Sequence, residues 1–181
     1  MSDEKRVFRK IAPDGSILAL NYAAEQDYSD NTLWTFYADY CKYTPAPIRE
    51  YFFAVMVNGS PDSVAGVDGR GLFRIVNPYY NQYGFNRFGD AKAVLLLSCF
   101  AGIKIAPKLS ELMTIPVIAG TSAVSQTSNG FWQTVRDKGD DVDTQKLTWV
   151  CCYESIKKVI ATTVLYPRAA IDGLKQVGWL Q

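Results

Sequence analysis

The sequence predicts an α/β fold with a mostly parallel central sheet. Two apolar runs, Tyr51–Val57 and Ala93–Leu97, have the length of a strand and lack polar alternation, which is typical of strands buried on both faces. The second run is followed by an amphipathic segment, Ala106–Met113, and then by a third apolar run, Ile115–Ala119. This strand–helix–strand order favours a right-handed crossover between parallel strands, with helices on both faces of the sheet.

Composition and charge limit the classes of protein that the chain can belong to. With 181 residues, of which 48% are hydrophobic and 13% aromatic, the chain is long enough for one globular domain over residues 1–181. Nineteen basic and eighteen acidic residues give a net charge of +1, so we expect neither nucleic acid nor a membrane surface as a partner. The charged start Met1–Arg6 has no apolar stretch after it, which predicts neither a secretory signal nor a membrane span and favours the cytoplasm.

The N-terminal part is expected to form a small hairpin and a helix. Val7–Lys10 and Ile17–Leu20 flank Pro13-Asp14-Gly15, and Asp-Gly readily takes the positive φ that a tight turn needs. Apolar residues at spacings of three and four predict a helix over Thr32–Lys42, which the prolines of Thr44–Pro47 end.

The segment between the first two strong strands is rich in Gly, Pro, Asn and Asp and is expected to be mostly irregular. Within it, Asn77–Gly89 concentrates aromatic and amide side chains in a predicted loop. Such a loop can stack on a planar ligand or hold a peptide, with Tyr80, Tyr83 and Arg87 as candidate binding residues. The alternative is a rigid loop that closes the core with its own aromatic rings.

The C-terminal part is expected to contain two strands and two helices. Phe131–Val135 and Leu147–Tyr153 are predicted to pair, joined by the charged loop Arg136–Gln145. A helix over Glu154–Val164 is expected to follow, and Pro167 is expected to open a last helix that ends near Gly178.

Cysteine usage and the absence of histidine exclude the common metal sites. The four cysteines form no C-x-x-C pair, and the chain contains no histidine, so we expect no metal and no cofactor. Neighbouring Cys151 and Cys152 are expected on opposite faces of a strand, as reduced, half-buried packing residues.

Small polar residues follow each of the two strongest strands. Asn58-Gly59 follows the first strand and Ser98-Cys99 the second, so parallel pairing would bring them together at the carboxyl edge of the sheet. Two alternatives stay open. Asn-Gly between apolar runs is typical of a tight hairpin, and a cysteine at a strand end is commonly a small buried hydrophobe.

Several of these motifs resemble the core of caspase-like cysteine peptidases, in particular the CHAT and bacterial toxin-associated branches. The resemblance lies in Val94–Gly102, followed by Ala106–Leu112 and Ile115–Gly120. Val55–Asp62 resembles the earlier strand of the family, with Asn58 where the family has histidine. The resemblance covers roughly residues 51–135 and implies a three-layer sandwich that acts on a polypeptide substrate or binds a partner protein.

The resemblance also implies roles for individual residues. Cys99 would be the nucleophile, and the backbone N–H groups of Gly59 and Cys99 would form the oxyanion hole. Asn58 occupies the position of the base but cannot accept a proton near neutral pH. A carboxylate such as Asp62 is a poor substitute, because negative charge disfavours the thiolate. The enzyme is therefore expected to be inactive or very weak, whether Asn58 is native or replaces a histidine.

Two functions of different classes follow. The first is a caspase-like pseudopeptidase that keeps Cys99 but lacks its base. The alternative is a binding module for a peptide or a nucleotide-like small anion at the carboxyl ends of the strands. The candidate binding residues at this edge are Ser98, Gly102, Asp62 and Gly120.

Overall fold

The computed structural model describes residues 7–11, 17–22, 32–37, 50–56, 59–64, 66–128, 131–136 and 146–181, with the backbone alone for the first three of these segments. Fourteen elements are described there. The strands are β1 Val7–Ile11, β2 Ile17–Tyr22, β3 Thr32–Tyr37, β4 Phe52–Met56, β5 Ala93–Leu97, β6 Val117–Gly120, β7 Ala123–Gln126, β8 Trp132–Val135, β9 Thr148–Tyr153, β10 Ile156–Thr162 and β11 Val164–Leu165. The helices are α2 Gly69–Tyr83, α3 Ile105–Met113 and α4 Pro167–Gln176.

The main sheet is mixed, with strand order β1-β2-β3-β4-β5-β6-β9-β10. Its centre is parallel, because β5 pairs in parallel with both β4 and β6. The strands on both flanks pair antiparallel. The predicted α/β class and the β5–α3–β6 crossover are therefore confirmed. The prediction of a mostly parallel sheet is wrong, because parallel pairing is confined to the three central strands.

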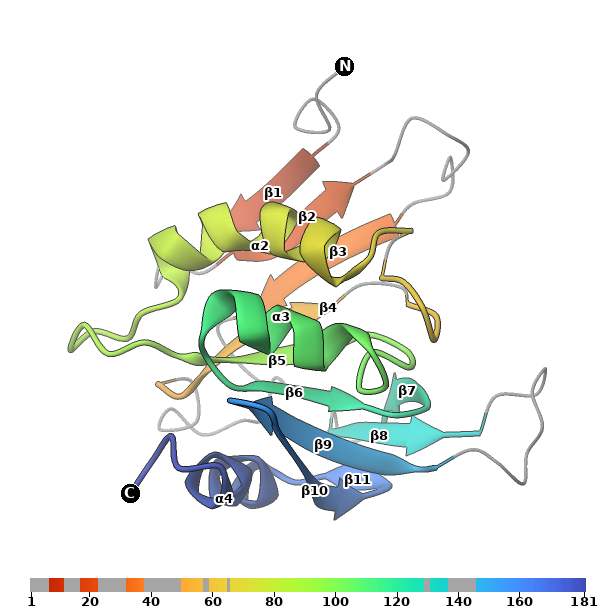
Figure 1. Ribbon diagram of the computed structural model, residues 1–181. Coiled ribbons are helices and arrows are strands. Elements are labelled where there is room, and N and C mark those ends of the chain that lie inside the picture. Colours follow the sequence, from red (N-terminus) through yellow and green to blue (C-terminus); the bar gives the residue numbers. More distant parts are fainter. Residues whose placement is uncertain are drawn as a thin grey trace.

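Both faces of the main sheet are covered. On one face, alternate residues of the strands, such as Val94 and Leu96 of β5, pack under α2 and α3. On the other face, Leu95 and Trp149 pack against α4 and against β8 and β11 of a second, three-stranded sheet in the order β11-β8-β7. Figure 1 shows α3 in front of the central strands and α4 beside β10 and β11. All five residues of β5 are buried, as its unbroken apolar run predicts.

The N-terminal hairpin is confirmed, since β1 and β2 pair antiparallel at one end of the sheet. Its turn at residues 13–15 lies outside the described residues. The predicted helix over Thr32–Lys42 is wrong in its first half, which is β3. Thr32, Trp34 and Phe36 belong to the β-branched and aromatic types that favour strands, and the edge of β4 supplies the pairing partner.

The predicted helix over Glu154–Val164 is also wrong, because this segment forms β10 and β11. Glu154 and Ser155 have φ of 48° and 67°, so they make the tight turn that returns β10 antiparallel along β9. The β-branched residues of the segment favour the strand that follows. The last helix is confirmed, with Pro167 at its first position.

The segment predicted to be irregular contains α2. Asp68 caps this helix by accepting a hydrogen bond from the Gly71 N–H at 2.8 Å. Leu72, Val76 and Tyr80 recur every four residues and face the core. This spacing predicts a helix, although the segment also contains glycines and a proline, which disfavour one. The predicted loop Asn77–Gly89 is therefore helix as far as Tyr83.

The predicted pairing of Phe131–Val135 with Leu147–Tyr153 is wrong. β8 pairs with β7 and β11 in the small sheet, whereas β9 lies between β6 and β10 in the main sheet. The two strands stack on opposite sides of a shared core that contains Trp132 and Trp149. The charged segment between them, 137–145, lies outside the described residues.

Cys151 and Cys152 point to opposite faces of β9, as predicted, since Cys151 packs on the α4 side and Cys152 on the α3 side. Both are fully buried rather than half-buried, and both are free thiols. Across the described parts of the chain, the helices are too short or too polar to cross a membrane.

Candidate functional site

The carboxyl ends of β4, β5 and β6 lie at one edge of the main sheet. Met56 is in register with Leu97, and Leu96 with Ala119, so the residues after these strands leave the sheet together. We call this region, formed by Gly59, Ser98, Cys99, Gly102 and Gly120, the strand-end site. Asn58 lies outside the described residues, so its side chain is not part of this description.

Gly59 packs directly on the chain that follows β5. A Cβ placed on Gly59 would lie 2.1 Å from Ser98 Oγ and 2.6 Å from the carbonyl oxygen of Cys99. Only a residue without a side chain fits this approach. The predicted proximity of Gly59 to Ser98 and Cys99 is therefore met.

The turn after Cys99 is tightly held against the end of β6. Gly102 donates its N–H to the carbonyl of Gly120 at 2.8 Å, and a Cβ on Gly102 would lie 2.9 Å from that same oxygen. Phe100 has a left-handed backbone, with φ of 62°, although its ring is buried. A left-handed residue other than glycine costs about 1–2 kcal/mol, so the surrounding contacts must impose this conformation.

The Cys99 side chain is partly exposed and lies against β7. Its sulfur accepts a hydrogen bond from the Val124 N–H at 3.5 Å and lies 4.0 Å from the Val124 carbonyl oxygen. Cys99 is thus at the surface of the strand end, in contrast to the sealed thiols of Cys151 and Cys152. This geometry gives the sulfur one backbone donor.

The Ser98 hydroxyl is buried and has no hydrogen-bond partner among the described residues. A buried hydroxyl without a partner costs about 1–3 kcal/mol, so it calls for a structural or functional reason. Since Gly59 packs against it, Ser98 contributes to the contact between the two strand ends rather than to an open binding surface.

The chain reverses direction after Gly59. Gly59 and Val64 form an antiparallel bridge, and Ser60 donates its N–H to the Ser63 carbonyl at 2.8 Å. The tip of this reversal is therefore Pro61–Asp62, two residues after Asn58-Gly59. Asp62 itself is exposed and pairs with Lys104 at 2.6 Å, so its carboxylate is directed to the N-terminal side of α3.

Two of the predicted binding residues are far from Cys99 along the sheet. Tyr80 donates its hydroxyl to the carbonyl of Lys92 at 2.6 Å, just before β5 begins, whereas Cys99 follows its end. Tyr80 is buried, and its burial raises the pKa of the phenol. It is a core residue rather than an accessible ligand contact. The side chain of Tyr83 lies outside the described residues.

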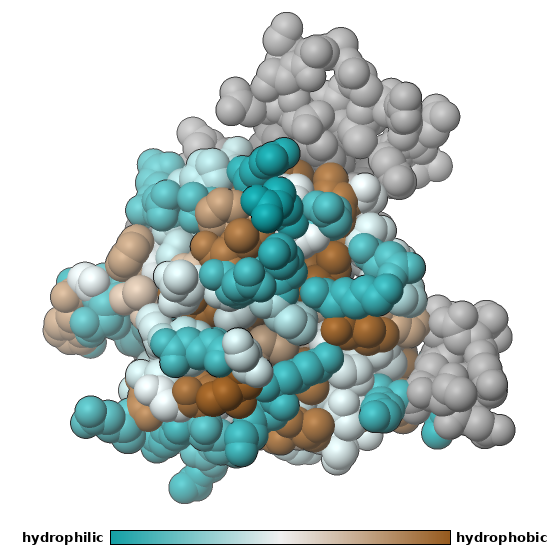
Figure 2. Space-filling view, viewed as in Figure 1, coloured by the Kyte–Doolittle hydropathy of each residue, from teal (hydrophilic) through white to brown (hydrophobic). Residues whose placement is uncertain are grey.

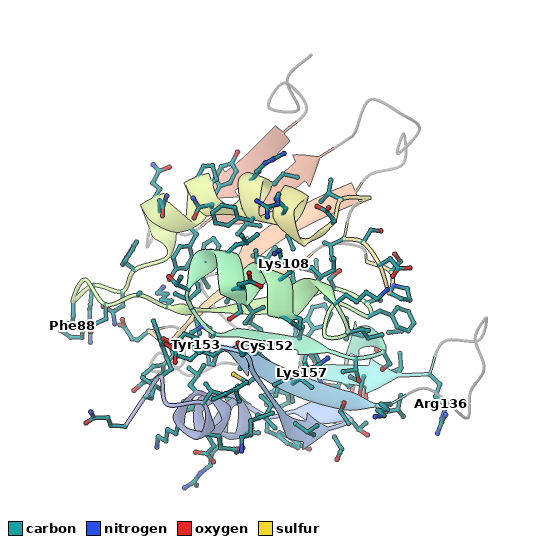
Figure 3. The ribbon with its side chains drawn as sticks, viewed as in Figure 1. Phe88, Lys108, Arg136, Cys152, Tyr153 and Lys157 are labelled. Atoms are coloured by element: carbon teal, nitrogen blue, oxygen red, sulfur yellow. The ribbon has the colours of Figure 1, made fainter. Side chains whose placement is uncertain are left out.

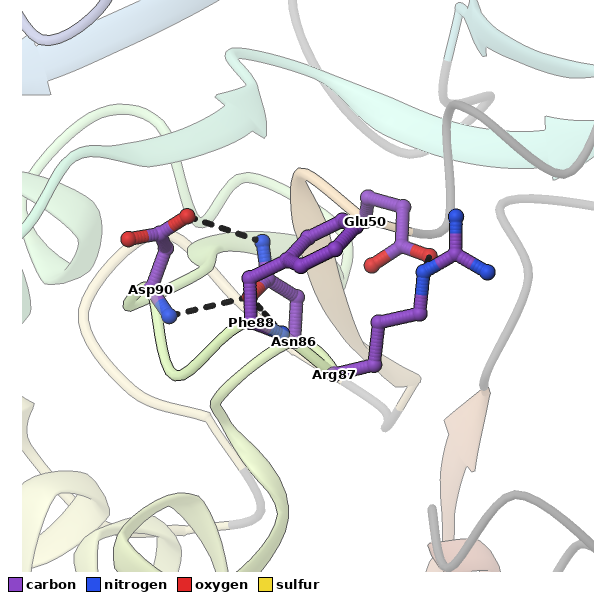
Figure 4. Close-up of polar contacts among 5 residues, drawn as sticks. All are labelled: Glu50, Asn86, Arg87, Phe88 and Asp90. Atoms are coloured by element: carbon purple, nitrogen blue, oxygen red, sulfur yellow. Dashed lines mark hydrogen bonds and ion pairs between the residues drawn. The ribbon is translucent and has the colours of Figure 1, made fainter.

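Arg87 belongs to the same distant end of the sheet, in the loop between α2 and β5. Its guanidinium pairs with Glu50 at 3.3 Å and lies 4.8 Å from the centre of the Phe88 ring. Asn86 Oδ1 accepts the N–H groups of Phe88 and Asp90, both at 2.9 Å. Figure 4 shows these contacts. Asn86 holds the loop internally, but the rings of Phe85 and Phe88 are exposed, so the loop does not close the core with its own aromatic side chains.

Sequence reasoning missed Phe100 and Val124. A left-handed backbone at a phenylalanine has no residue-type signal, because such positions are usually glycine or asparagine. The contact of Val124 with Cys99 spans 25 residues and depends on how the small sheet meets the main sheet. Within the parts that the structure describes, no group of His, Cys, Asp and Glu side chains is arranged to hold a metal ion.

Comparisons with models of protein families, with curated protein sequences and with solved structures gave no match to this chain.

Proposed function

We propose that this chain is a caspase-like pseudopeptidase, a three-layer α/β domain that keeps the nucleophile position of a cysteine peptidase but lacks its base. The observation that carries the proposal is the partly exposed Cys99 at the end of the central parallel strand, with Gly59, which follows the neighbouring strand β4, packed on its backbone. The covering of both faces of the sheet and the β5–α3–β6 crossover support it.

The chemistry at issue is attack by a thiolate on a peptide carbonyl. The cysteine sulfur forms a bond to the carbonyl carbon, the peptide C–N bond breaks, and the leaving amine takes a proton that a base has first removed from the thiol. With no histidine in the chain, that proton has no efficient acceptor. The loss of a positioned base typically lowers the rate by about 10²–10⁴-fold, so at most a trace of hydrolysis is expected.

The test is to restore the base. In an Asn58→His variant, we expect cleavage of a peptide library or of the chain itself, abolished by a further Cys99→Ala substitution. Circular dichroism and the melting temperature of each variant establish that it is folded. A folded Asn58→His variant that cleaves nothing contradicts the proposal.

A further inference from the structure

A cavity of about 510 Å³ lies between α3 and the β9–β10 hairpin, and its lining includes none of the five residues that form the strand-end site. Its polar and aromatic lining comes from the outer side of α3, the end of β9, the turn and the start of β10. Its charged and aromatic lining residues are Lys104, Lys108, Glu111, Tyr153, Glu154 and Lys157. Figure 3 labels four of the lining residues and shows that they come from different elements. This volume is typical of small-molecule sites.

The cavity arises because α3 does not cover the edge of the sheet. The sheet contacts of α3 are with β6 and β9, whereas β10 is packed against α4 on its other face. β10 is therefore open on the α3 side along its first residues, which are exposed. Figure 2 shows hydrophilic side chains mixed with hydrophobic ones on the face that carries α2 and α3.

Lys157 is directed to this open face. It stands opposite Cys152 in the β9–β10 register, and Cys152 packs into the core beneath α3. Cross-strand neighbours share a face, so the stem of Lys157 lies on the α3 side. Its ammonium donates to the carbonyl of Ile103 at 3.2 Å, next to the start of α3. Among the described residues, no carboxylate forms an ion pair with Lys157.

Two more lysines from α3 and its N-cap line the same cavity. Lys104 stands at the N-cap of α3 without a side-chain capping bond, and the first turn of the helix contains no acidic residue. Positive charge at this end of a helix is unfavourable without an anion nearby. Lys104 pairs with Asp62, but the two side chains are 67% and 76% exposed, and such exposed pairs contribute little to stability.

Lys108 also has a weak partner. It pairs with Glu111 at 3.5 Å on the surface of α3. An incoming anion can displace such an exposed partner at small cost. The acidic residues Glu111 and Glu154 belong to the last turn of α3 and the β9–β10 turn, so the cavity is cationic toward the start of α3 and anionic toward its end.

We propose that this cavity binds a small molecule through a phosphate or carboxylate group held by Lys104, Lys108 and Lys157. All three lysines line the cavity, and the ammonium of Lys157 lies beside the residue that precedes Lys104. Glu154 and Ser155 of the hairpin turn line the other end of the cavity, where a polar part of the ligand would lie.

The test uses pyrophosphate and citrate as probes, measured by isothermal titration calorimetry at about 0.15 M salt, where the Debye length of about 8 Å suppresses diffuse attraction. We expect at least one of the two anions to bind, and the comparison of the two shows whether phosphate or carboxylate is preferred. Lys157→Ala and Lys108→Ala should each weaken binding by about tenfold or more, since hydrogen bonds to charged groups contribute about 1.5–3 kcal/mol.

Lys158→Ala is the matched control. Lys158 is the next residue of β10 and stands opposite Cys151, which packs on the α4 face, so its loss removes the same charge from the opposite side of the strand. Binding should be unchanged in this variant. Glu111→Gln should strengthen binding, because it removes a competing partner of Lys108. If neither anion binds the unmodified protein, or if Lys158→Ala weakens binding as much as Lys157→Ala, the proposal is wrong.

Discussion

Gly59 and Phe100 show how single residues determine the shape of the strand-end site. Gly59 is required because the neighbouring strand end leaves no room for a Cβ. Phe100 is held in a left-handed conformation by its hydrogen bond from N–H to the Ser122 carbonyl at 2.9 Å and by burial of its ring. Strain of this kind is common next to functional residues, and here it lies directly after Cys99.

A Gly59→Ala substitution should destabilise the protein by about 1–3 kcal/mol, as is typical when a well-packed site is overfilled. The reason is the 2.1 Å and 2.6 Å approaches of the new Cβ to Ser98 Oγ and to the Cys99 carbonyl oxygen. Urea unfolding followed by circular dichroism measures the change. The double variant Gly59→Ala/Ser98→Ala should recover part of the loss, because only the carbonyl contact remains. Unchanged stability of Gly59→Ala would mean that the two strand ends are not in contact.

The individual residues of the site differ in how well the sequence predicted them. Gly59, Ser98 and Cys99 could be predicted because each follows an unbroken apolar strand, and parallel pairing then brings the strand ends together. Tyr80 and Arg87 could not be placed correctly, because a missed helix carries the first into the core and the second to the opposite end of the sheet.

Among the secondary-structure elements, two segments show helical spacing in the sequence but form strands. In Thr32–Tyr37 and Ile156–Thr162, apolar residues recur at spacings of three and four residues, which is typical of a helix. Both segments are also rich in β-branched or aromatic residues, which favour strands. Each pairs with a strand that would otherwise be exposed at its edge, β4 and β9 respectively. Ladder hydrogen bonds and burial of the neighbour outweigh a weak local preference for helix.

The end of α3 offers a test of element stability. Thr114 follows the helix in a left-handed conformation, with φ of 58° and ψ of 34°, and is exposed. Because glycine adopts this conformation without the penalty of a Cβ, Thr114→Gly should stabilise the protein by about 0.5–1 kcal/mol. Thermal and urea unfolding measure the gain. Val159→Gly, at an exposed position inside β10, is the control and should be destabilising, since glycine weakens a strand interior. Equal effects of the two substitutions would contradict the role of the backbone conformation.

At the scale of the molecule, the described residues form two hydrophobic cores, one on each face of the central strands. Alternate residues of β4, β5, β6 and β9 pack on opposite faces, which makes both faces depend on the same strands. Cys151 and Cys152 illustrate this, because adjacent thiols are sealed in different cores. Burial raises the pKa of Cys151 to about 12 and that of Cys152 to about 11, with the charge of Lys157 lowering the latter in part.

These pKa shifts predict a loss of stability at alkaline pH. A thiol whose pKa is raised in the folded protein keeps its proton there and loses it on unfolding, so the folded protein binds more protons between the two pKa values. The contribution of the protonated Cys152 thiol to the free energy of unfolding is complete below about pH 9 and declines as the pH rises toward 11. Between pH 7 and pH 11, the free energy of unfolding should fall less in Cys152→Ala than in the unmodified protein. The difference between the two decreases should be about 1–3 kcal/mol. Parallel curves for the two proteins would show that ionisation of Cys152 is not coupled to unfolding.

Local patterns in the amino-acid chain were enough to establish the α/β class, the buried strands β4 and β5 and the crossover through α3, and the composition shows that the chain has no histidine. These features depend on residues that lie within a few positions of one another in the sequence, because their burial and backbone geometry are determined locally. Only the tertiary structure showed which strands pair with β3, β8 and β10. It also revealed the contact of Cys99 with Val124 and the cavity beside Lys157. Each depends on which surfaces remain unpaired once the rest of the chain has packed. Packing between residues that are distant in the sequence supplies most of the free energy that stabilises these arrangements.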